Sequence, residues 1–364
     1  MRTLILTSAV ISASLSLSQP AFADLEQRLA QLEKEIEQMR KSKAHRQHDS
    51  DLSLYGSFRP VLTYSDDDKK TTTDIQDGLS RFGLKGSTNV MESTQVFFQG
   101  EWNVKIADGG QIDGARLAFA GISGEYGKLT LGKQRPPQYL LIGEHVDIFN
   151  HRASPYAYDG TAFAHGDTTA GFNNFFIDNS TMYDYQRNGF RFLAAVRTDG
   201  SSGENSADIV NAGVSFDAGV VYLAYAYADS TGADKVNSEL VGDKLESNAF
   251  AIHTTLAGLY IAAAYQDITF DPAAGKSVDR NSTDVSLAYP LPRRFKVKTG
   301  YFDYDDGDKT GSSRSFSGIN LTLEKQLADN VRVHLEYLYQ DPESGDSTTQ
   351  ISAGLRYDFS GNLL

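Results

Sequence analysis

The segment VRVHLEYLYQ (residues 331–340) alternates apolar and polar side chains along its whole length. Its odd-numbered positions are Val, Val, Leu, Tyr and Tyr, whereas the even-numbered positions include Arg332, His334 and Glu336. A period of two is typical of a β-strand whose two faces meet different surroundings. Charged side chains face neither hydrocarbon nor a dry core without a large cost in free energy. The segment therefore predicts a strand between an apolar exterior and a water-filled interior.

The same alternation recurs in sixteen segments between residues 51 and 359, and the connections between them alternate in length. Short connections such as Ala257-Gly258 are interspersed with long polar ones, namely 65–77, 199–206, 229–246, 269–281 and 305–312. An even number of strands near ten residues, with short turns at one end and long loops at the other, is typical of outer-membrane barrels. We therefore predict an all-β fold, a sixteen-stranded antiparallel transmembrane β-barrel over residues 51–364, with a water-filled lumen.

The longest stretch without strand alternation runs from Arg135 to Asp178 and contains PPQYLLIGEHVDIFNHRASPYAYDGTAFAHGDTTAGFNNFF. A loop of this length is uncommon in a compact domain unless it is functional. We expect it to fold into the mouth of the barrel and to narrow the pore.

The first fifty residues are predicted to lie outside the barrel. Arg2, the apolar run Leu4–Leu17 and the A-x-A sequence at 21–23 are typical of a signal peptide over residues 1–23. Residues 24–46 carry apolar residues at alternating spacings of four and three, which predicts a short coiled-coil helix, with an amphipathic helix lying on the barrel as the alternative. Residues 47–50 form the linker. From the signal peptide and the barrel pattern together, we expect the protein to be exported through the periplasm to the outer membrane of a Gram-negative cell.

The composition limits the partners. The chain has no cysteine and a formal net charge of −13, so neither disulfides nor nucleic acid binding is expected. An acidic surface suits contact with outer-membrane lipid and lipopolysaccharide through divalent cations. His253 and His334 lie on strands without a nucleophile motif nearby, and no metal-site or phosphate-loop motif occurs. We therefore expect no catalysis, no metal site and no cofactor.

Basic residues at the predicted inward positions cluster on the strands nearest the two ends of the barrel sequence. Closure of a barrel places the last strand beside the first, so these positions form one basic wall. The set comprises Arg59, Arg81, Lys85 and Arg116 at the pore constriction, and Lys296, Lys298, Arg332 and Arg356 elsewhere in the lumen. The long loop supplies the acids Glu144, Asp147, Asp159 and Asp167. Acids facing bases across a constriction would sort solutes by charge.

Several segments resemble the trimeric general porins of Gram-negative bacteria. They are DLSLYGSFRP (51–60), SRFGLKG (80–86), ARLAFAG (115–121), YGKLTLGKQ (126–134) and NSTMYDYQRNGFRF (179–192). The resemblance implies a homotrimer, a third external loop folded into the pore, and passive diffusion of small hydrophilic solutes. It also implies that Arg81 and Arg116 belong to a basic ladder. Members of this family normally end on an aromatic residue, whereas here Ser360-Gly-Asn-Leu-Leu364 follows Phe359.

Three alternatives remain open at this point. A substrate-selective porin for an anion or a sugar would share the architecture. A barrel enzyme would need a nucleophile, and a structural or adhesive barrel with a fully plugged pore would not conduct.

Overall fold

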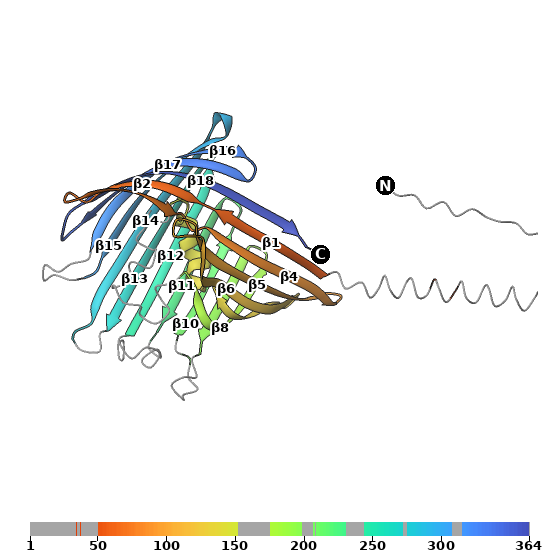
Figure 1. Ribbon diagram of the computed structural model, residues 1–364. Coiled ribbons are helices and arrows are strands. Elements are labelled where there is room, and N and C mark those ends of the chain that lie inside the picture. The colour runs from red at the N-terminus through yellow and green to blue at the C-terminus, as the bar shows by residue number, and fades with distance from the viewer. Residues whose placement is uncertain are drawn as a thin grey trace, which may run out of the picture. The chain divides into compact units, whose positions relative to one another are not determined.

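Figure 1 shows the computed structural model, in which a single antiparallel sheet curves round and closes on itself. The structure describes residues 50–151, 175–198, 209–230, 244–271, 275–307 and 315–363, with the single positions 34, 37 and 207. The chain divides into two units, Met1–Asp49 and Ser50–Leu364. The predicted signal peptide and coiled coil, and the first three residues of the linker, lie outside the described residues apart from positions 34 and 37.

The barrel is built from the following elements. The strands are β1 (Ser50–Phe58), β2 (Pro60–Asp66), β3 (Thr71–Asp77), β4 (Arg81–Met91), β5 (Thr94–Lys105), β6 (Gln111–Gly124), β7 (Gly127–Gln134), β8 (Ile177–Arg187), β9 (Phe190–Arg197), β10 (Ile209–Asp217), β11 (Val221–Asp229), β12 (Lys244–Leu256), β13 (Leu259–Asp271), β14 (Val278–Leu291), β15 (Phe295–Asp305), β16 (Phe316–Ala328), β17 (Val331–Pro342) and β18 (Thr348–Asn362). Three short helical segments are η1 (Tyr139–Gly143), α2 (Glu144–Val146) and η3 (Pro292–Arg294). No helix in the described part of the chain is long and apolar enough to cross a membrane.

The eighteen sheet segments make sixteen barrel strands, as predicted. β1 and β2 are one strand interrupted only at Arg59, and both pair with β18; β3 and β4 are the next strand, interrupted at 78–80. The two interruptions face each other. The amide of Gly78 donates to the carbonyl of Arg59 at 2.7 Å, and the amide of Arg59 donates to Ser80 Oγ at 2.7 Å. The break therefore keeps its hydrogen bonds while it turns the Arg59 side chain into a buried position.

The predicted division between inward and outward faces is confirmed. Leu335 is 54 % exposed on the outer surface, whereas its neighbour Glu336 is 3 % exposed and faces the interior. The same alternation runs along the other strands and puts most large exposed apolar side chains outside. An outer surface of this kind suits hydrocarbon.

Two predicted details of the barrel are corrected. The polar segment 65–77 was expected to be a loop, but 71–77 forms β3 and pairs with β2 through its backbone. This strand is rich in Thr and Asp and lacks the alternation of apolar and polar residues, because it extends past the apolar zone of the barrel. At the other end, β18 continues beyond Phe359, since Asn362 pairs with Ser53 and the Leu363 amide donates to the Leu52 carbonyl at 2.7 Å.

Part of the interior is apolar, a feature that the prediction of a water-filled lumen did not include. The loop between β7 and β8, residues 135–176, is called the third loop below. Its residues Leu141, Ile142 and Val146 are fully buried. They belong to one cluster with inward alanines from three neighbouring strands, Ala224, Ala226, Ala249, Ala251, Ala262 and Ala264. Burial of each large side chain contributes about 1.5–3 kcal/mol. Alanine leaves room for the loop to lie against the wall, and the loop in turn shields the alanines from water.

Candidate pore constriction

The third loop follows the inner wall of the barrel from Gln138 to His151. The Gln138 amide donates to Asn211 Oδ1 of β10 at 2.9 Å, and its side chain donates to Ser247 Oγ of β12 at 2.6 Å. Further along, the hydroxyls of Tyr222 and Tyr260 donate to the carbonyls of Leu141 and His145 at 3.0 and 2.8 Å. The loop is therefore held through its backbone by strands β10 to β13.

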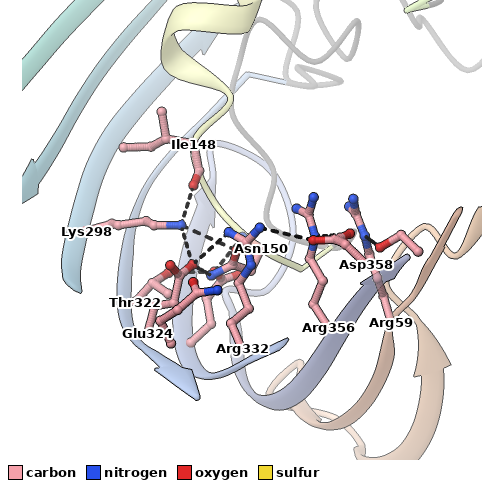
Figure 2. Close-up of polar contacts among 12 residues, drawn as sticks. Arg59, Ile148, Asn150, Lys298, Thr322, Glu324, Arg332, Arg356 and Asp358 are labelled. Atoms are coloured by element: carbon pink, nitrogen blue, oxygen red, sulfur yellow. Dashed lines mark hydrogen bonds and ion pairs between the residues drawn. The ribbon is translucent and has the colours of Figure 1, made fainter. Parts of the chain in front are cut away.

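A network around Lys298 holds the next part of the loop, as Figure 2 shows. Lys298 Nζ donates to the Ile148 carbonyl at 2.8 Å and to Glu324 Oε2 at 3.0 Å. The Asn150 side chain donates to the same carboxylate oxygen at 2.9 Å. Lys298 and Glu324 are both buried, so this ion pair lies in a site where neither charge could remain unpaired without a large cost.

Glu336 of β17 and His151 complete the attachment. The amides of Asn150 and His151 donate to the two Glu336 oxygens at 3.1 and 3.2 Å. The His151 ring lies within 3.3 Å of Thr63 Oγ1 on β2 and 3.5 Å of Ser352 Oγ on β18. Between Gln138 and His151 the loop thus contacts the wall from β10 round to β2.

Basic side chains gather on the wall that this part of the loop leaves uncovered. Arg116 Nε donates to Glu101 Oε1 at 2.7 Å and its Nη1 donates to Asn103 Oδ1 at 3.1 Å. Arg81 Nε lies 3.9 Å from the second Glu101 oxygen. One carboxylate is therefore shared by two guanidinium groups, which leaves an excess of positive charge on β4 to β6.

The arginines of β17 and β18 extend this wall through Asp358 (Figure 2). Arg356 Nε donates to both Asp358 oxygens at 2.9 Å, and Arg332 Nη2 approaches one of them at 3.3 Å. Arg332 Nη1 is also 3.6 Å from Glu324, which links the arginines to the network around Lys298. Arg59 Nε donates to Ser57 Oγ at 2.8 Å, while its Nη2 is buried and has no hydrogen-bond acceptor among the described residues.

The loop acids Glu144 and Asp147 rise from the opposite side of the barrel. His145, which lies between them, packs on the rings of Tyr222 and His253 with centroid distances of 4.2 and 4.5 Å. Tyr222 lies on β11 and His253 on β12. Seven barrel strands separate β12 from β4, which bears Arg81, in either direction round the barrel. Asp147 accepts a hydrogen bond from Tyr139 at 2.7 Å. Desolvation by the surrounding wall raises the pKa of Glu144, while Arg191 and Arg135 act in the opposite direction.

The remaining predicted residues lie in different places. Lys85 lies further toward the short turns, with its ammonium 5.9 Å from the Tyr55 ring centre, and Lys296 is exposed on β15. Asp159 and Asp167 lie outside the described residues.

Four inward carboxylates were not predicted as site residues. Glu101, Glu324 and Asp358 pair with the bases, and Glu336 accepts from the loop amides. Their inward phase was visible in the alternation. The bases that pair with Glu101 and Glu324 lie on other strands, whereas Arg356, which pairs with Asp358, lies on the same strand. Arg135 was also missed. Its guanidinium lies 4.1 Å from the Tyr139 ring centre and 4.9 Å from that of Phe176, at the two ends of the loop.

A closed sixteen-stranded barrel with an apolar exterior, a charged lumen and a loop along its inner wall is an outer-membrane channel. A family model described as "Gram-negative porin" matches residues 7–364, and the chain belongs to this family. Its relatives are outer-membrane porins, non-enzymatic channels of the Gram-negative outer membrane, and this chain forms a channel for general diffusion there.

Individual relatives are distant in sequence. Porin-like protein L of Photobacterium profundum is 25 % identical over 330 residues, covering 85 % of this chain and 92 % of that protein. Outer membrane protein F of Serratia marcescens is 28 % identical over 59 % of each chain. Among solved structures, the anion-selective porin from Comamonas acidovorans has a TM-score of 0.74 at 16 % identity, covering 85 % of this chain and all of that one. The trimer form of OmpT from Vibrio cholerae has a TM-score of 0.68 at 19 % identity, covering 85 % and 99 %.

Proposed function

We propose that the third loop and the arginine-bearing wall together form the constriction of this channel, and that their opposed charges set its ion preference. The observation that carries the proposal is the attachment of residues 138–151 along the inner wall from β10 to β2. It leaves Glu144 and Asp147 opposite the strands that bear Arg81 and Arg116. In this proposal Asp159 and Asp167 add to the acidic side.

A transverse arrangement of this kind acts without a binding pocket. Acids on one side and guanidinium groups on the other orient water, and a permeating solute must exchange that water for its own polar groups. Small hydrophilic solutes with a charge or dipole pass, whereas bulky or apolar solutes are held back. Size is limited by the loop because its backbone is fixed at many points.

The test is the reversal potential in a KCl gradient across a planar bilayer. Arg81→Ala with Arg116→Ala removes two positive charges and leaves Glu101 without a guanidinium partner. We expect a shift toward cation preference. Arg187→Ala, which changes an exposed residue at the end of β8, is the matched control. An unchanged reversal potential in the double variant would refute the assignment.

A second candidate function, an anion-selective channel, is favoured by one observation. In the part of the chain that the structure describes, Arg59, Arg81 and Arg116 share few acceptors, and Arg59 Nη2 has none. The Comamonas acidovorans porin with the same fold is described as anion-selective. The same reversal potential distinguishes the two, because the wild-type protein would then prefer chloride strongly over potassium.

We further propose that the protein is a homotrimer and that residues 24–46 strengthen it as a coiled coil. The trimer form of the similar Vibrio cholerae OmpT supports the first part, and the heptad spacing supports the second. Deletion of residues 24–46 should lower the temperature at which the trimer dissociates on a semi-native gel while single-channel conductance stays the same. A trimer that melts unchanged would exclude the coiled coil.

A further inference from the structure

We infer that the half of the lumen nearest the short turns contains a second site, separate from the constriction, which binds small monoanionic aromatic acids. The inference rests on the channel function proposed above only in that solutes must reach the lumen. The site is a cavity of about 440 Å³ against the inner side of β1, β4, β5, β6 and β7. This volume lies in the range of small-molecule sites, about 300–1,000 Å³.

Two lysines of this cavity, Lys85 and Lys128, have no ion pair among the described residues. The cross-strand neighbours of Lys85 are Ser53 and Gln99, both neutral. Lys128 lies opposite Ser123 and Asp184, but the Asp184 carboxylate is occupied by Arg191, with two hydrogen bonds of 3.0 Å. Within the described residues neither ammonium has an ion pair. Both are therefore available to a solute anion.

Aromatic rings form the second part of the cavity. Phe97 and Phe119 face inward and meet edge to face, with ring centres 6.4 Å apart and an interplanar angle of 78°. The Lys128 ammonium lies 5.4 Å from the Phe97 ring centre. A shift of register at Trp102 between β5 and β6 explains why Phe119 and Arg116 both face inward, although they differ in phase.

These rings are unusual among the inward apolar residues of the barrel. The alanines of β11 to β13 are covered by the third loop, whereas Phe97 and Phe119 are only half-buried, and no described loop residue lines their cavity. Exposing a phenyl group to lumen water costs free energy that an occupant with its own ring would recover.

The chemistry of the cavity defines the occupant. An aromatic ring packs on Phe97 and Phe119, and a carboxylate accepts from Lys85 or Lys128. Asp51 also lines the cavity, so the three charged groups sum to one positive charge and match a monoanion better than a dianion. Phe97 precedes Glu101 by four residues on β5, which is roughly 13 Å along the strand, so the site is distinct from the constriction.

The experiment compares three probes as blockers of conductance in a planar bilayer, each added to both sides. Benzoate carries ring and charge, cyclohexanecarboxylate carries charge without an aromatic face, and benzyl alcohol carries the ring without charge. For the wild-type protein we expect the half-blocking concentration of benzoate to be about two- to ten-fold below that of cyclohexanecarboxylate. Benzyl alcohol should not block.

Variants separate the two halves of the site. In the variant with Phe97→Leu and Phe119→Leu, the half-blocking concentrations of benzoate and cyclohexanecarboxylate should become nearly equal. Lys85→Gln with Lys128→Gln should weaken block by both acids. Lys296→Gln, which removes an inward lysine from β15, is the control and should leave the ratio unchanged. Equal block by the two acids in the wild type, or a ratio that survives the double leucine variant, would overturn the site.

Saturation-transfer NMR with benzoate on the detergent-solubilised proteins measures binding without conduction. If the wild-type channel conducts but shows no preference for benzoate over cyclohexanecarboxylate, the proposed site is overturned and the channel function stands. Binding of benzoate by a protein that does not conduct overturns the channel function and leaves the site standing.

Discussion

Removing the carboxylate of Glu336 should weaken the attachment of residues 150 and 151 of the third loop to the wall. Glu336 is buried on β17 and accepts hydrogen bonds from the amides of Asn150 and His151 and from the Thr322 hydroxyl, the last at 2.5 Å. Substitution by alanine therefore removes the carboxylate that accepts from both amides.

The size of the effect follows from the two loop hydrogen bonds. A hydrogen bond to a charged group contributes about 1.5–3 kcal/mol, so loss of both weakens the attachment by about 3–6 kcal/mol. Even the lower figure raises the population of the detached state about a hundred-fold relative to the wild type. The Lys298–Glu324 network still holds the Ile148 carbonyl and the Asn150 side chain, so detachment should be confined to the chain from His151 onward.

Single-channel recording is the assay. Glu336→Ala should increase the noise of the open-channel current and raise the mean conductance, because the loop withdraws from the lumen for part of the time. Glu336→Gln should have a smaller effect, since one oxygen still accepts. Glu343→Ala removes an exposed carboxylate at the end of the same hairpin and serves as the control. A quiet channel of wild-type conductance in Glu336→Ala would refute the attachment.

Three further perturbations test other parts of the structure. A Cβ atom on Gly300 would lie 2.6 Å from Phe149 Cζ, so Gly300→Val should displace the loop and lower stability by about 1–3 kcal/mol, whereas Gly361→Val, with open space around it, should not; thermal melting decides. Burial beside His253 and Arg191 lowers the pKa of His145 to about 4, so the detached ring binds protons more readily, and the loop attachment should weaken as pH falls from about 6.5 to 4. The melting temperature of a His145→Gln variant should fall less than that of the wild type over this pH range. The same dependence of melting temperature on pH in both proteins would contradict the role of His145. Deletion of residues 360–364 removes the pairing of β18 with β1 at 53–55 and should lower the unfolding temperature on a semi-native gel; an unchanged temperature would show that the extension contributes nothing.

Alternation of side chains determined most of the fold. Because one face must meet hydrocarbon and the other water, VRVHLEYLYQ alone predicts both the strand and its orientation, and sixteen such segments predict the barrel. The pattern failed where neither face meets hydrocarbon, as at 71–77, or where chain ends add strand pairing without an apolar signal, as at 360–362. In both places the backbone hydrogen bonds of a neighbouring strand decide the structure, and these leave no periodic trace.

The candidate constriction was only partly accessible from the sequence. Inward phase identified the bases Arg81, Arg116 and Lys298, and the missing alternation identified the loop. Which charges meet depended on register and closure, so only the tertiary structure could pair Arg116 with Glu101 and assign Lys298 to the loop backbone. The alanines on β11 to β13 gave a signal that can be interpreted only once the loop is known to cover them. Sequence determines which side of a strand a residue occupies, whereas the folded barrel decides its neighbours, because those come from strands far apart in the chain.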